Sequence, residues 1–234
     1  MNEAVNADSE NPSQQQLSSL LEHYQNGRLN EAEKLALSIT NEFPKHQFAW
    51  KVLGVVLKQT GRVIDSLTAM QKSVDLMPQD AEAHSNLGNT LQELGRLEDA
   101  EASCNRAIAL KPDYAEAHSN LGITLQELGR LDEAEASCRQ AITLKPDFAL
   151  AHYGLSKIFY IMGNEDLALK SIKQANEIEP KSKEYQLMLS FIEARKSRKE
   201  NEAAVGDTIN IGALTELISN PRVLNRSVEA ELIT

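Results

Sequence analysis

Glycine, proline and small residues recur along this chain at intervals of 34 residues. A fixed period of about 20–50 residues is the sequence signature of stacked copies of one supersecondary unit. We therefore expect residues 13–182 to form five repeats, with bounds 13–46, 47–80, 81–114, 115–148 and 149–182. The three series are Gly27, Gly61, Gly95, Gly129 and Gly163; Pro44, Pro78, Pro112, Pro146 and Pro180; and Ala32, Ser66, Ala100, Ala134 and Ala168.

Each repeat has the pattern of two amphipathic helices. In the third repeat His84, Leu87 and Leu91 fall on one face of a helix, at the spacing set by its 3.6-residue turn. Gly95 follows, and glycine readily takes the left-handed conformation that ends a helix. A second apolar stripe comes next, and Pro112 ends it because proline lacks an N–H and clashes with the preceding turn. The pattern predicts a helix–turn–helix hairpin in every repeat.

Two glycines lie inside the expected first helices, where glycine is otherwise unfavourable. Gly88 and Gly122 would face the small residues Ala100 and Ala134 of the second helices. We expect the two backbones of each hairpin to approach closely there. A larger side chain would then cost about 1–3 kcal/mol by overpacking.

The two central copies share the pattern H-S-N-L-G-x-T-L-Q-E-L-G-R-L-x-x-A-E-A-S-C-x-x-A-I-x-L-K-P. This pattern resembles the tetratricopeptide repeat (TPR). The resemblance implies an all-α fold, a right-handed α-solenoid of about five helix–turn–helix repeats with a C-terminal capping helix, which we place at residues 183–199. Residues 1–12 are expected to be a disordered N-terminus, and residues 200–234 a tail or linker that is partly irregular.

Three histidines recur once per repeat and could suggest a row of metal ligands. His84, His118 and His152 stand where the second repeat has Trp50. Equivalent side chains on stacked helices point the same way and lie at least one helix spacing apart, about 8–10 Å. We therefore interpret the histidines as residues packed inside the hairpins, and we predict no metal site.

The sequence shows none of the common signatures of an enzyme. It contains no P-loop, no dinucleotide-binding glycine motif and no nucleophile elbow. Cys104 and Cys138 stand at apolar positions of the repeat and are expected to be buried free thiols. We predict that the chain is not an enzyme, with no catalytic residues and no cofactor.

Charge and composition indicate which classes of partner and which cellular compartment are expected. A net charge of −10 would repel a phosphate backbone, so nucleic acid is not expected as a partner. No apolar run approaches the ~18 residues that span a bilayer, and we expect no membrane partner. The N-terminal segment lacks the pattern of a signal peptide, and two cysteines are too few for a disulfide framework. The expected location is the cytoplasm.

The inner wall of such a stack is made by the first helix of each repeat. Side chains half a turn away from the core stripe of these helices are free to meet a partner. They are polar in the third and fourth repeats and apolar in the second. We predict a peptide-binding groove lined by Phe48, Val55, Glu82, Asn86, Asn89, Glu93, Glu116, Asn120, Glu127 and Lys157.

Asn86 and Asn120 lie one repeat apart, and an asparagine amide can donate to and accept from one peptide unit. This pair resembles the asparagine ladder in the TPR arm of the O-linked N-acetylglucosamine transferase, which implies that it holds an extended peptide by its backbone. Val52 and Gly154 replace asparagine on either side, so the ladder has two rungs. The alternative is that both asparagines are solvated copies produced by one duplication.

The predicted function is a non-catalytic scaffold for protein–protein interaction that binds an extended, neutral to basic peptide segment in the groove. Glu93 and Glu127 would attract Lys or Arg, and Phe48 or Val55 would seat an apolar side chain. The alternative is the truncated recognition arm of a larger enzyme, a glycosyltransferase or a 2-oxoglutarate/iron oxygenase, whose catalytic domain is absent from this chain. The tail would either cover the groove or lead into that further domain.

Overall fold

The computed structural model of the chain describes residues 11–202. The expectations for residues 1–10 and 203–234 lie outside the described residues. The chain divides into two compact units, residues 1–192 and 193–234. Among the described residues there are eleven α-helices and no β-strand, and consecutive helices pack as hairpins. The expected all-α solenoid is confirmed.

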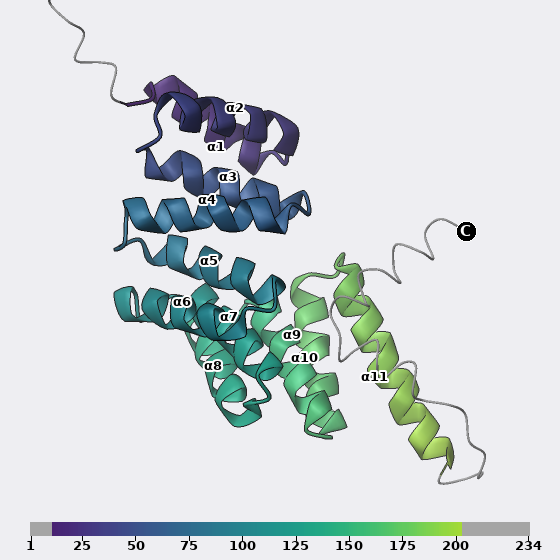
Figure 1. Ribbon diagram of the computed structural model, residues 1–234. Helices are drawn as coiled ribbons and strands as arrows, with labels where there is room; N and C mark the ends of the chain where they lie inside the picture. The colour runs from purple at the N-terminus through teal and green to yellow at the C-terminus, as the bar shows by residue number, and fades with distance from the viewer. Residues whose placement is uncertain (1–10, 203–234) are drawn as a thin grey trace, which may run out of the picture. The chain divides into compact units, whose positions relative to one another are not determined.

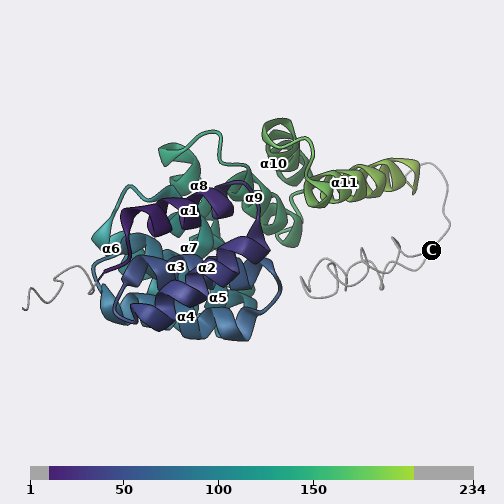
Figure 2. The ribbon, with the colours of Figure 1, turned by 90° about the horizontal axis from the view of Figure 1, so that it is seen from above.

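The helices pair in chain order, and Figure 1 shows the pairs stacked from α1–α2 to α9–α10. The second helix of each pair also packs on the first helix of the next pair. In addition, the first helices α1, α3, α5, α7 and α9 contact one another in sequence. Figure 2 gives the view from the α1–α2 end. The bounds are α1 Gln14–Gln25, α2 Leu29–Glu42, α3 Gln47–Gln59, α4 Val63–Leu76, α5 Ala81–Glu93, α6 Leu97–Leu110, α7 Ala115–Glu127, α8 Leu131–Leu144, α9 Ala149–Ile161, α10 Glu165–Ile178 and α11 Lys183–Glu202.

The recurring glycines end the first helices, as the sequence predicts. Gly95 has a φ of 71°, in the left-handed region. Its N–H donates to the carbonyl of Gln92, and the N–H of Arg96 donates to the carbonyl of Leu91, each over 2.9 Å. These two bonds satisfy carbonyls that the end of a helix leaves without partners. The glycines at the other four positions of the series have φ values between 67° and 79°.

Glycines inside the first helices allow the two helices of a hairpin to approach closely. This confirms the expected close approach of the two backbones at Gly88 and Gly122. A Cβ atom at Gly88 would lie 2.7 Å from Sγ of Cys104 and 3.2 Å from the carbonyl oxygen of Ala100. Gly122 faces Cys138 in the same way. Both cysteines are free and buried, and burial raises the pKa of each thiol to about 12.

The histidines hold the turn between consecutive repeats. The ring Nε2 of His118 lies 2.9 Å from the carbonyl oxygen of Pro112, six residues earlier. His84 and His152 bond Pro78 and Pro146 in the same way, and Trp50 donates its indole N–H to Pro44. Only His84 is buried, while His118 and His152 are half-buried. We expected the three histidines to pack inside the hairpins, and this expectation is incomplete. Each histidine also bonds a proline carbonyl across the turn, which the repeat period alone does not reveal.

Helix α11 begins in register with the first helices of the repeats. Gln186 donates its side-chain N–H to the carbonyl of Pro180, as the histidines do in earlier repeats. Tyr185 is buried, and its ring centroid lies 5.1 Å from that of Tyr153 on α9. The ring of Phe191 meets Tyr160 of α9 edge-on at 5.5 Å. The start of α11 thus covers α9, and the exact limits of a capping helix at residues 183–199 stay a prediction.

Candidate binding surface on the first helices

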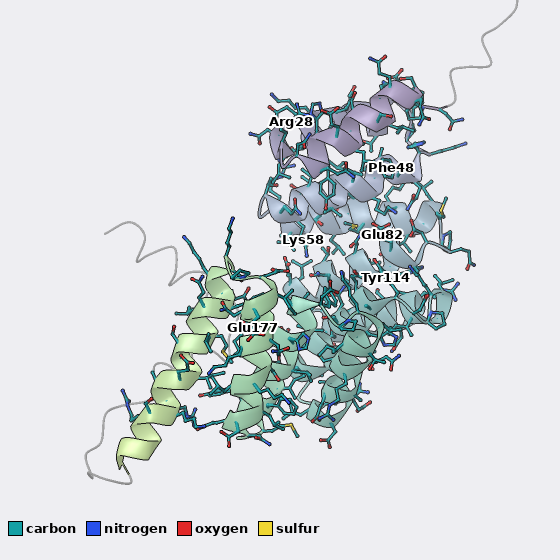
Figure 3. The ribbon with its side chains drawn as sticks, turned by 180° about the vertical axis from the view of Figure 1, so that it is seen from behind. Arg28, Phe48, Lys58, Glu82, Tyr114 and Glu177 are labelled. Atoms are coloured by element: carbon teal, nitrogen blue, oxygen red, sulfur yellow. The ribbon has the colours of Figure 1, made fainter. Side chains whose placement is uncertain are left out.

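The predicted groove residues lie on α3, α5, α7 and α9, whose consecutive contacts make one continuous surface, here called the first-helix face. Glu82 and Glu93 are exposed, and the other eight predicted residues are half-buried. In Figure 3 Lys58 and Glu82 lie toward opposite ends of the boundary between α3 and α5. Whether each residue is free to bind a partner depends on the hydrogen bonds and ion pairs that it makes with the neighbouring first helix.

Between α3 and α5, a lysine that the sequence analysis did not single out joins two carboxylates. The ammonium of Lys51 lies 3.0 Å from Oδ2 of Asp80 and 2.7 Å from Oε2 of Glu82. Asp80 also accepts from the side chain of Gln47 and from the backbone N–H groups of Glu82 and Ala83, and so caps α5.

Burial opposes the charge on both members of this pair, but the bonds outweigh it. For Asp80, burial raises the pKa, while the N–H of Ala83, the Lys51 ammonium and Gln47 lower it, and the net pKa is below the usual value. For Lys51, burial lowers the pKa, while the bonds and charges of Glu82 and Asp80 raise it, and the net pKa is above the usual value. Both groups are therefore held in their charged forms at neutral pH.

A second lysine of α3 engages the far end of α5. The ammonium of Lys58 donates to Oδ1 of Asn89 over 2.8 Å and lies 3.1 Å from Oε1 of Glu93. Asn89 and Glu93, both predicted to meet a partner, therefore already bond within the chain.

Between α5 and α7 the side chains bond through amides. Asn120 donates its side-chain N–H to Oγ of Ser85 over 3.0 Å, and Gln92 donates to Oε1 of Glu127. Among the described residues the side chain of Asn86 makes no hydrogen bond, although the residue is half-buried. The two rungs of the expected ladder thus differ: Asn120 joins the helices, whereas Asn86 keeps its donors and acceptor available.

Internal partners also change the expected charge of the surface. Glu116 lies 3.5 Å from the ammonium of Lys145, and its side chain is 41% exposed. Glu82 is the most exposed of the predicted carboxylates, at 56%. A basic side chain of a partner would therefore meet Glu82 and Glu116 more readily than Glu93 and Glu127, which bond Lys58 and Gln92.

Between α7 and α9 two buried side-chain oxygens of α7 are left without partners among the described residues. Oγ of Ser119 and Oε1 of Gln126 are buried and have no hydrogen-bond partner among the described residues. Ser119 and Gln126 stand one repeat after Ser85 and Gln92, whose partners are Asn120 and Glu127. One repeat after those partners the chain has Gly154 and Ile161, which offer no side-chain hydrogen bond.

Lys157 lies at this same junction. Its ammonium is 5.7 Å from the centroid of the Tyr153 ring, and no hydrogen bond or ion pair joins it to another described residue. Burial lowers the pKa of Lys157 below its usual value, while the charges of Glu127 and Glu184 oppose that shift. The predicted groove residue Lys157 is therefore a half-buried cation that bonds no other residue in the described part of the chain.

The apolar residues predicted to seat a side chain are in part committed to the core. Phe48 packs against the cluster around Leu53, and Val55 against the cluster around Met70. Val52 and Gly154 stand at the repeat position of Asn86 and Asn120 in the repeats before and after them. Val52 is 5% exposed and Gly154 is buried, so neither is available to a partner. The groove formed by the ten residues stays a prediction.

Metal binding has no support in the described part of the chain. There, no group of three or more His, Cys, Asp and Glu side chains is placed to hold an ion. Each of the three recurring histidines uses its Nε2 on a proline carbonyl.

Comparison with protein families decides what kind of repeat this is. Two family models, both described as tetratricopeptide repeat, match residues 79–147 and 125–190. Residues 79–190 match the tetratricopeptide repeat. The matched segments cover the third to fifth TPRs and the start of α11, and a search of curated proteins gives no match.

Solved structures of TPR proteins have the same fold. A thermophilic TPR protein of Thermus thermophilus is 25% identical, with a TM-score of 0.66, over 76% of this chain and 97% of the other. MamA is 27% identical, with a TM-score of 0.56, over 68% of this chain and 94% of the other. YrrB, described as a TPR protein with an unusual peptide-binding site, is 19% identical, with a TM-score of 0.57, over 79% of this chain and 92% of the other.

The search for membrane-spanning segments covered the described helices. None of them combines the length and the apolar character needed to cross a bilayer.

Proposed function

We propose that this TPR chain is a protein-interaction scaffold whose first-helix face binds an extended segment of a partner polypeptide across the third and fourth repeats. The continuous contacts from α3 to α9 support this proposal, because they place side chains of successive repeats on one surface. The fold is also that of YrrB, a protein whose description includes a peptide-binding site. The compartment in which this chain works is proposed to be the cytoplasm.

The observation that carries the proposal is the amide of Asn86, which bonds nothing among the described residues. The amide atoms of Asn86 are not among the buried, unbonded side-chain atoms of the described residues, so they are accessible to a hydrogen-bonding partner. Asn120 donates its side-chain Nδ2 to both Oγ and the backbone carbonyl of Ser85 and retains its own carbonyl oxygen. Asn86 can therefore donate to and accept from a peptide unit of an extended segment, and Asn120 can accept from one, in the manner of the asparagine ladder of the O-linked N-acetylglucosamine transferase.

The charges on this face favour a neutral or weakly basic segment. Lys51, Lys58 and Lys145 already neutralise carboxylates of the face in part. Glu82 and Glu116 remain exposed enough to attract a lysine or arginine of the partner. An acidic segment would meet these two carboxylates and is disfavoured.

The proposal is tested with peptides selected from a random dodecamer phage library on the wild-type chain. Asn86→Ala and Asn120→Ala each remove hydrogen bonds worth about 0.5–1.5 kcal/mol net. The double variant should weaken binding by about 1–3 kcal/mol, roughly 5- to 150-fold in Kd. The control is Asn105→Ala on α6, an exposed asparagine away from the first-helix face.

Stability measurements separate a lost contact from a damaged fold. Asn86→Ala should leave the urea midpoint unchanged, whereas Asn120→Ala should lower stability by about 1 kcal/mol because it breaks the bond to Ser85. Equal peptide affinity for the wild-type chain and the double variant would refute the role of the asparagines. Failure to select any peptide would refute the peptide-binding function itself.

A further inference from the structure

The two asparagines of the expected ladder differ in how their amides are held. Nδ2 of Asn120 lies 3.0 Å from Oγ and 3.4 Å from the backbone carbonyl oxygen of Ser85 on α5. A backbone carbonyl can only accept a hydrogen bond, so the end of the amide that faces it must be the NH2 group. The side-chain carbonyl oxygen of Asn120 bonds no described residue and is not among the buried unbonded oxygens, so a partner can reach it.

The repeat register explains why this bond forms between α5 and α7. The bond joins a serine to the asparagine that follows one repeat and one residue later. One repeat earlier Lys51 stands in the place of Ser85, and its ammonium bonds two carboxylates, so Asn86 has no serine hydroxyl to donate to. One repeat later Gly154 stands in the place of Asn120 and has no side chain that could donate.

We propose that Ser85 fixes the amide of Asn120 so that its carbonyl oxygen faces the bound segment, which must therefore place a backbone N–H opposite it. Proline has no N–H and is excluded from that position of the partner. Asn86 can turn its amide either to donate or to accept, so the position opposite Asn86 admits proline. This polarity rests on the proposed function, since it concerns the surface assigned to the partner segment.

The distance between the two asparagines sets how far apart the two positions lie in the partner. Asn86 and Asn120 occupy the same repeat position on α5 and α7, which contact each other. Packed helices are about 8–10 Å apart, and an extended chain advances about 3.3–3.6 Å per residue. The position that excludes proline and the position that admits it are therefore about two or three residues apart in the bound segment.

Amide-to-ester substitution tests the required N–H, because an ester replaces the N–H by an oxygen without adding bulk. A peptide selected on the wild-type chain is synthesised with one ester at each backbone position in turn, and Kd is measured for each. One ester should bind the wild-type chain about tenfold more weakly than the parent peptide, and should bind Asn120→Ala about as well as the parent does. No ester should show a comparable penalty that depends on Asn86, because that amide can turn.

Ser85→Ala tests whether the serine positions the amide. Without Oγ the NH2 group of Asn120 can turn outward, so the ester penalty should fall from about tenfold to about threefold or less, while the Kd of the parent peptide changes little. The matched control is Ser119→Ala, one repeat later, which removes an Oγ that bonds no described residue and should keep the full penalty. An unchanged penalty in Ser85→Ala, or an equal fall in both variants, would overturn the role of Ser85.

A measurement on the free chain separates a failure of this proposal from a failure of the proposed function. In NMR spectra the side-chain N–H signals of Asn120 should exchange with water more slowly than those of Asn86, and Ser85→Ala should remove this protection. Equal exchange at both asparagines refutes the fixed amide even if a peptide binds. If no ester penalty depends on Asn120 while the Asn86/Asn120 double variant still loses affinity, the required N–H is refuted and the proposed function stands.

Discussion

Alanine at Gly88 tests whether the hairpins depend on a close approach of their two helices. The added Cβ would lie 2.7 Å from Sγ of Cys104, about 0.8 Å closer than a comfortable contact of roughly 3.5 Å. Cys104 is fully buried, and the carbonyl of Ala100 at 3.2 Å belongs to the backbone, so neither can move away freely. Overpacking of this kind costs about 1–3 kcal/mol.

Helix propensity must be separated from this cost, because alanine is favoured over glycine by about 1 kcal/mol in a helix. Gly154→Ala on α9 provides the control, since its nearest neighbours would be the Cys138 and Ile123 side chains, at 3.1 and 3.9 Å. The gain in propensity is common to both variants. The 3.1 Å contact at Gly154 is itself tight, so Gly88→Ala should be less stable than Gly154→Ala by about 1–2 kcal/mol.

Urea unfolding followed by circular dichroism measures this difference. The double variant Gly88→Ala with Cys104→Ala should recover part of the loss, because it removes the sulfur and leaves the Ala100 carbonyl. If Gly88→Ala is as stable as Gly154→Ala, the close approach does not limit the packing and the reasoning is wrong.

Three further predictions concern single polar groups. Asp80→Asn should lower the free energy of unfolding at pH 7 by about 1–2 kcal/mol, because it weakens the α5 cap and the bond to Lys51. The pKa of Asp80 is lowered in the folded state, so its contribution to stability is lost as the pH falls below 3.8. The urea midpoints of variant and wild type should therefore converge there. His118→Leu should cost about 1 kcal/mol in thermal unfolding by losing the bond to Pro112, whereas His118→Gln should not. Lys157→Met should raise the melting temperature at pH 7, and this gain should shrink as pH approaches 10.5, because burial lowers the folded pKa of Lys157.

Much of the fold could be predicted from the sequence because the residues concerned act within one repeat. Gly95 ends its own helix, and Gly88 faces Cys104 sixteen positions later in the same hairpin. Contacts within one repeat recur in every repeat that has the same residues, so the 34-residue period is enough to predict them. The bond from His118 to Pro112 crosses from one repeat to the next, and the period shows its position without showing its partner.

The candidate surface was less predictable because its chemistry depends on pairs of repeats. Taking side chains half a turn from the core stripe selects residues of α5 and α7, but it misses Lys51, Lys58 and Gln92, which bond residues of the predicted groove. These side chains bond the carboxylates and amides that the sequence analysis left for a partner. A search for charge complements one repeat away would have found Lys51 and Glu82, which lie 31 residues apart.

Nearly identical repeats can therefore carry different chemistry. Ser85 and Gln92 of residues 81–114 correspond to Ser119 and Gln126 of residues 115–148. Ser85 Oγ and the Gln92 side-chain N–H are bonded, whereas Ser119 Oγ and Gln126 Oε1 bond no described residue. For the serines the difference comes from the following repeat, where Gly154 replaces the donor Asn120. For the glutamines, Ile161 replaces Glu127, the acceptor of the Gln92 side-chain N–H. Since a side chain of a first helix meets the next first helix, a substitution in one repeat changes the binding capacity of the repeat before it. In this chain, the side chains of the fifth repeat provide no hydrogen-bond partner for the buried oxygens of Ser119 and Gln126 in the fourth.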